Sequence, residues 1–73
     1  MTEPVFNDAI VACLGEIHGR LSDAARITKA AQACAEAGSL SEAVTISMDI
    51  EQLIYEAGRL HDAASLLNRL SND

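Results

Sequence analysis

The sequence is poor in aromatic residues: its 73 residues include one Phe, one Tyr and no Trp. The hydrophobic fraction still reaches 49%, so the apolar content is mostly Ala, Leu, Ile and Val. Small side chains let helices approach closely, but each of them buries little apolar area. A single domain of this length hides only about 60% of the surface that its unfolded chain exposes. We therefore expect a thin core and, because small scaffolds commonly compensate by oligomerisation, a homodimer.

Basic residues are also scarce. Five Lys and Arg stand against eleven Asp and Glu, which gives a formal net charge of -6. The basic residues do not cluster along the chain, and a net negative charge repels phosphate backbones and anionic lipid surfaces. No apolar run approaches the roughly 20 residues that span a bilayer. The sequence therefore predicts neither a nucleic-acid partner nor a membrane partner.

Cysteine occurs only twice, as Cys13 and Cys34. The spacing forms neither a CxxC redox motif nor a set of zinc ligands, so we expect two free thiols in apolar helical surroundings. The sequence alone does not decide whether the two cysteines form a disulfide between adjacent helices. The first residues lack the basic and apolar regions of a secretory signal, and we expect a cytoplasmic protein.

The most informative positive feature is a unit that occurs three times, beginning at Gly19, Gly38 and Gly58. Each copy reads G-x-L-x-[DE]-A-[AV]-x-[IL]. The copies start nineteen and then twenty residues apart, which matches one helix of about four turns plus a tight connection. We therefore interpret one unit as one turn followed by one helix.

Each part of the unit has a mechanical interpretation. Glycine suits the left-handed position that ends a helix. The acidic residue would lie in the first turn of the next helix, near the positive end of the peptide dipoles. The alanine that follows would let the start of the helix lie close to its neighbour. These acid and alanine pairs are Asp23 with Ala24, Glu42 with Ala43, and Asp62 with Ala63.

The sequence thus predicts one all-α domain over 1–73 with four short antiparallel helices, arranged as a helical-hairpin array or a four-helix bundle. The helices are expected at about 4–17, 22–37, 41–57 and 61–71, each boundary uncertain by about two to four residues. In the first of them, apolar residues recur at steps of three and four, the mark of an amphipathic helix. They are Phe6, Ile10, Cys13, Leu14 and Ile17.

The third predicted helix carries two apolar stripes. The wider one comprises Ala43, Ile46, Ile50, Leu53, Ile54 and Ala57, and the narrower one comprises Val44, Met48 and Tyr55. Either the helix is central and packs on both sides, or the narrower stripe is a docking face, for which Met and Tyr are suitable residues. The fourth predicted helix has more leucines than so short an element can bury. The predicted partner interface is Val44, Met48, Tyr55, Leu66 and Leu70.

Two resemblances add expectations. The stretch Ile17-His18-Gly19-Arg20-Leu21-Ser22-Asp23-Ala24-Ala25, followed by Ala30-Ala31, resembles the junction between the two helices of a tetratricopeptide repeat. Leucine stands where that family usually has tyrosine, and the unit recurs at every predicted helix instead of once per helix pair. Tetratricopeptide repeats bind proteins and peptides, so the resemblance implies a protein partner.

The pair Ser39-Leu40, with Val44, Ile46, Met48, Ile50 and Glu51 after it, looks like the prosthetic-group site and recognition helix of acyl and peptidyl carrier proteins. The residue before the serine is Gly38, where that family usually has Asp or His, and 22–37 is expected to be helical where the family has a long loop. This resemblance implies a phosphopantetheine-type attachment at Ser39. The alternative is that Ser39 only caps a helix, since Glu42 stands at capping-box spacing, with Ser41 as a competing cap.

Catalytic motifs are missing. His18 and His61 lie beside predicted turns, where a histidine is usually solvated. The carboxylates Glu36, Asp49, Glu51, Glu56 and Asp62 form no Glu-x-x-His pair, and no glycine-rich phosphate loop occurs. We therefore expect that the protein is not an enzyme and that it binds neither a metal ion nor a cofactor. The sequence favours a self-associating protein-interaction module, a small regulatory or adaptor domain, with a carrier protein built on Ser39 as the alternative.

Overall fold

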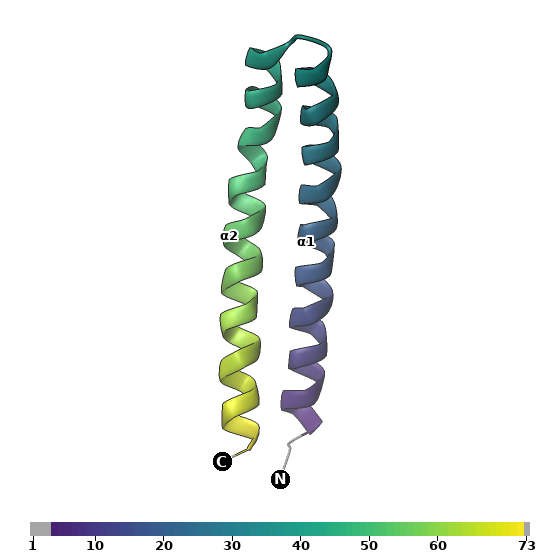
Figure 1. Ribbon diagram of the computed structural model, residues 1–73. Coiled ribbons are helices and arrows are strands. Elements are labelled where there is room, and N and C mark those ends of the chain that lie inside the picture. Colours follow the sequence, from purple (N-terminus) through teal and green to yellow (C-terminus); the bar gives the residue numbers. More distant parts are fainter. Residues whose placement is uncertain (1–3, 73) are drawn as a thin grey trace.

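The structure, a computed structural model that describes residues 4–72, is a hairpin of two long antiparallel helices (Figure 1). Helix α1 runs from Pro4 to Glu36 and helix α2 from Leu40 to Ser71. The molecule is a rod with extents of 56 × 14 × 11 Å. Neither helix has a stretch long and apolar enough to cross a membrane.

The predicted all-α class is confirmed, but the prediction of four short helices is wrong. Helix α1 continues without a break through Gly19, and α2 continues through Gly58, where turns were expected. A glycine inside a helix costs only about 0.5–1 kcal/mol relative to alanine. Ending the helix there would leave the apolar residues on both sides of the glycine without a common partner helix. Tertiary packing therefore overrides the local turn signal at both positions.

The turn predicted at Gly38 is confirmed. Gly38 has a φ of 96°, and no other described residue has a positive φ. The Ser39 amide donates to the Cys34 carbonyl at 3.0 Å and the Gly38 amide donates to the Ala35 carbonyl at 3.0 Å, which is the Schellman arrangement that satisfies the last carbonyls of a helix. This connection reverses the chain within three residues and places α2 alongside α1.

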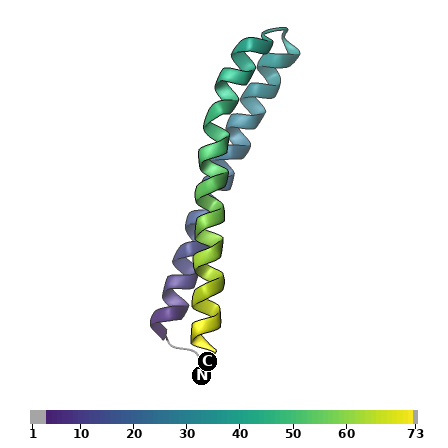
Figure 2. The ribbon, with the colours of Figure 1, turned by 90° about the vertical axis from the view of Figure 1, so that its left-hand side faces the viewer.

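The contact between the helices is a heptad seam. In the notation a to g, positions a and d of both helices face the partner helix, and every one of them is buried or half-buried. In α1 they are Phe6, Ile10, Cys13, Ile17, Arg20, Ala24, Ile27, Ala31 and Cys34. In α2 they are Ala43, Ile46, Ile50, Leu53, Ala57, Leu60, Ala64, Leu67 and Ser71. A seam of period 3.5 makes helices wind around each other, and Figure 2 shows α1 passing from one side of α2 to the other.

The register of the hairpin pairs a small residue with a larger one in several layers. Because the chain turns at Gly38 and Ser39, residues at equal distances from the turn lie at the same level. The larger members come from either helix, as Leu53 opposite Ala24 illustrates. Among residues 4–72, the buried apolar residues are all alanines: Ala24, Ala31, Ala43, Ala57 and Ala64. The core is therefore thin, as expected, and consists of the single seam between α1 and α2.

The three repeated units do not have equivalent places in this seam. Ala24 and Ala43, the alanines that follow the acid in the first two units, are buried as expected. In the third unit Ala63 is exposed and its neighbour Ala64 is buried instead. The reason is that the second and third units start twenty residues apart, one short of three heptads. Only Glu42 lies in the first turn of a helix, whereas Asp23 and Asp62 lie within helices.

Candidate interaction surface

One side of the hairpin carries exposed aliphatic side chains from both helices. In an antiparallel pair, the e positions of the two helices flank the same edge of the seam, and the b positions lie beside them. Leu14 (53% exposed), Leu21 (48%) and Ile54 (55%) occupy e positions. Val11 and Val44 occupy b positions and are exposed as well. We call this set of five residues the apolar flank.

Charged residues are nearly absent from the e and b positions, which form the side of the hairpin that carries the apolar flank. Within residues 4–72, the e and b positions of the two helices include one carboxylate, Glu51, and no Lys or Arg. The polar residues there are mostly small or neutral, such as Thr28 and Ser47, together with the two histidines. Depletion of charge is what distinguishes the centre of a protein interface from ordinary surface.

The opposite edge of the seam is acidic. Its g positions carry Glu16, Asp23, Glu42, Asp49 and Glu56. The hairpin therefore has two chemically distinct edges, and the chain's excess of negative charge is concentrated on one of them.

Arg20 is the one charged residue among the described a and d positions, and it joins the seam to the acidic edge. Its Nε donates to Glu56 Oε1 at 3.1 Å, which makes an ion pair between the two helices. Its Nη1 donates to Glu16 Oε1 at 2.6 Å within α1. The hydrogen bond to Glu16, with a smaller contribution from Glu56, raises the pKa of the Arg20 guanidinium above its ordinary value. A charged residue at a seam position can fix the register of paired helices, and Arg20 pairs where the facing residue is the small Ala57.

Glu56 is the titratable member of this network. Its Oε2 accepts a hydrogen bond from Gln52 Nε2 at 3.0 Å, and this bond, together with Arg20, lowers the pKa of Glu56 below its usual value. A carboxyl whose pKa falls on folding stabilises the folded state above its unfolded pKa, and the contribution disappears as the pH falls through the folded pKa.

We therefore expect Glu56→Gln to lower the melting temperature at pH 7 and to have little effect once the pH has fallen below the folded pKa of Glu56. Thermal melts followed by circular dichroism across this pH range measure the difference. Asp49→Asn, which removes another carboxylate from the same edge, corrects for the general relief of negative charge. An equal effect of Glu56→Gln at both ends of the pH range would contradict the assigned network.

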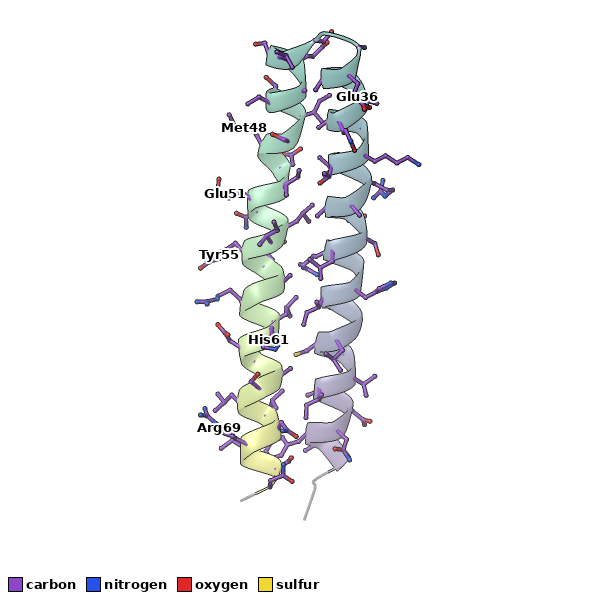
Figure 3. The ribbon with its side chains drawn as sticks, viewed as in Figure 1. Glu36, Met48, Glu51, Tyr55, His61 and Arg69 are labelled. Atoms are coloured by element: carbon purple, nitrogen blue, oxygen red, sulfur yellow. The ribbon has the colours of Figure 1, made fainter. Side chains whose placement is uncertain are left out.

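The outer surface of α2 holds a second group of apolar side chains. Met48 (69% exposed) and Tyr55 (59%) point away from α1 (Figure 3). With Glu51 and Gln52 they line a shallow hollow, to which α1 contributes nothing. The guanidinium of Arg59 lies 5.4 Å from the centre of the Tyr55 ring, a cation–π contact that covers part of the ring.

The five residues predicted as the partner interface are all exposed, but they do not form one surface relative to the seam. Val44 lies on the apolar flank, and Met48 and Tyr55 lie on the outer surface at f positions. Leu66 and Leu70 lie near the open end of the hairpin at c and g positions, on the side of the acidic edge. As an interface the set stays a prediction, and it omitted four of the five residues of the apolar flank: Val11, Leu14, Leu21 and Ile54.

Ser39 lies in the connection between the helices and is exposed. It occupies the N-cap position of α2, but its side chain makes no capping hydrogen bond. The capping box expected with Glu42 is therefore not formed; Glu42 Oε2 lies 3.9 Å from Cys34 Sγ instead. The helical segment expected at 22–37 is the last part of α1, which ends at Glu36.

The two cysteines lie on the same helix, both at d positions and both half-buried. Twenty-one residues of helix separate them by about 30 Å, far beyond the reach of a disulfide. A disulfide between Cys13 and Cys34, considered above for the case that they lie on adjacent helices, is therefore ruled out. Both thiols are free.

The histidines lie apart on different helices, and both are exposed. Within residues 4–72 no three His, Cys, Asp or Glu side chains come together in a way that could hold a metal ion. Comparison of this chain with models of known protein families, with curated proteins and with solved structures finds no match. Both resemblances noted in the sequence therefore stay predictions, and the function has to be argued from the surface of the hairpin itself.

Proposed function

We propose that this hairpin is a protein-interaction module that packs its apolar flank against helices of another protein chain. The observation that carries the proposal is the pattern of exposure on the two sides of the seam. Large aliphatic side chains stay about half exposed along one edge, where charge is depleted, while the other edge is acidic.

The geometry of the flank suits a helical partner. Leu14 and Leu21 are one heptad apart on α1. Ile54 on α2 stands two residues closer to the turn than Leu21, an offset of about 3 Å. The shallow groove between two antiparallel helices accepts the side chains of further helices at the spacing of a helix bundle. Burying three such aliphatic side chains that are half exposed contributes on the order of 3 kcal/mol before the entropy of association is subtracted.

The proposed compartment is the cytoplasm. Two free thiols that have no partner within reach in their own chain suit a reducing environment, in which cysteines persist without pairing.

Site-specific photocrosslinking in living cells tests the proposal. A benzophenone amino acid at position 21, on the apolar flank, is expected to give covalent protein adducts on irradiation. The same residue at position 29, where the exposed Lys29 stands on the outer surface of α1, is expected to give few adducts. Equal labelling at the two positions, or no adduct at position 21, would remove the support for an interaction through this flank.

A further inference from the structure

We infer that the occupant of the apolar flank is a second copy of this chain, so that two hairpins form a four-helix bundle with twofold symmetry. This inference rests on the proposed function and specifies the partner. Three observations lead to it: the area that the hairpin leaves exposed, the distribution of its charges, and the level at which its aliphatic residues stand.

The exposed area agrees with what a dimer removes. The chain exposes 5281 Å². A folded monomer of 7.7 kDa is expected to expose about 4300 Å², so the hairpin has an excess of about 1000 Å². A stable interface covers about 800 Å² on each partner. One further hairpin packed along the rod is therefore enough to bring the exposed area per chain into the range of a compact protein.

The charges favour self-association through the apolar flank over association through the opposite edge. Two copies that met through their acidic edges would bring together like charges from Glu16, Asp23, Glu42, Asp49 and Glu56 of each chain. Like charges in a desolvated interface oppose binding strongly. Two copies that meet through the apolar flank bring together few ionisable side chains: at the e and b positions these are only Glu51 and the exposed histidines. The acidic edges then face solvent on both sides of the bundle.

The aliphatic residues of the flank are placed for a symmetric contact. A twofold interface uses the same patch on both chains, so that each patch must complement itself. Leu21 and Ile54 stand within two residues of the same level, an offset of about 3 Å, on different helices and near the middle of the rod. When two flanks meet at this level, these two residues of each copy form one aliphatic layer, whether the two turns lie at the same end of the bundle or at opposite ends.

Sedimentation equilibrium of the purified chain is expected to give twice its mass of 7.7 kDa. The double variant Leu21→Glu/Ile54→Glu is expected to sediment as a monomer, because it places four carboxylates in one layer of the dimer. Met48→Gln/Tyr55→Gln, which changes two exposed apolar residues of the outer surface, is the matched control and is expected to remain a dimer. Circular dichroism reports whether each variant keeps its helices.

Mixing oppositely charged variants keeps the test decisive if a single variant fails to fold. Leu21→Lys/Ile54→Lys alone is also expected to be a monomer, whereas an equimolar mixture with Leu21→Glu/Ile54→Glu is expected to regain the dimer mass. A mixture that stays monomeric, or a dimer that both double variants of the flank retain, would overturn the inference.

The remaining outcomes separate this inference from the proposed function. A monomeric wild-type chain that still gives position-specific adducts to a different protein would overturn the second copy as partner and leave the interaction module intact. A monomeric chain without such adducts would overturn both.

Discussion

Replacement of Gly15, Gly19 and Gly58 by alanine is expected to raise the free energy of unfolding by about 2–3 kcal/mol, because each helical glycine costs about 0.5–1 kcal/mol relative to alanine. All three lie within helices, and a Cβ added at any of them would meet no atom within 4 Å beyond the adjacent residues and the backbone of its own helix. The gain arises from the narrower conformational range of the unfolded chain. For a domain of this size it corresponds to a rise in melting temperature of roughly 10–20 °C.

Gly38→Ala is the control with the opposite sign. Its φ of 96° is a conformation that L-residues rarely adopt, and forcing alanine into it costs about 1–2 kcal/mol. Chemical denaturation of the single variants separates the two classes. Gly58→Ala is also measured alone, because position 58 lies beside the apolar flank. A destabilising effect of Gly19→Ala comparable to that of Gly38→Ala would show that the chain turns at Gly19.

The part of the fold that could be predicted from the sequence depends on local signals that agree with tertiary packing. At Gly38 an apolar helical run ends, glycine supplies the positive φ, and Glu42 follows in the first turn of the next helix. The steps of three and four at Phe6, Ile10 and Ile17 identify seam positions, because they follow from the helical period alone. These features require no knowledge of what lies across the seam.

The turns at Gly19 and Gly58 could not be judged from local signals. A glycine between two helical stretches is compatible with a chain reversal and with an uninterrupted helix, since its cost inside a helix is only about 1 kcal/mol. The decision is made by the seam: Ile17, Arg20 and Ala24 continue one heptad pattern across Gly19. The pattern becomes visible only when the two sides of the glycine are assigned to a single helix.

The candidate surface was predicted only in part for the same reason. On a short helix ending at position 57, Ile54 belongs to the wide stripe and would be buried. On the long helix α2 it occupies an e position and is 55% exposed. Leu14 and Leu21 were assigned to two different elements, so their spacing of one heptad on the same edge was hidden. Val44 was named as a member of the narrower stripe with Met48 and Tyr55, and its exposure of 59% does not depend on where the helices end.

The largest effect of a single substitution is expected for Ala64→Asp, with a loss of about 3–5 kcal/mol of folding free energy, the cost of an unpaired charge in a closed interface. Ala64 is 7% exposed and stands in the seam at the level of Cys13. The introduced carboxyl would have only the weakly donating thiol of Cys13, and no basic residue, in its layer. Because a domain of 73 residues is stable by only about 4–11 kcal/mol, a large share of the folding free energy would be lost.

Ala63→Asp is the matched control, since it places the same residue one position earlier on the same helix. Ala63 is exposed on the acidic edge, so only the lower helix propensity of Asp, about 0.7 kcal/mol, and some like-charge repulsion should be lost. Urea denaturation of both variants measures the difference. Burial also raises the pKa of a carboxyl, so the deficit of Ala64→Asp should shrink as the pH falls and the introduced group takes up a proton. The alanine after the acid of the third repeated unit is Ala63, so a larger effect at that position would favour four short helices. A larger effect at Ala64 would place the heptad seam across the whole of α2.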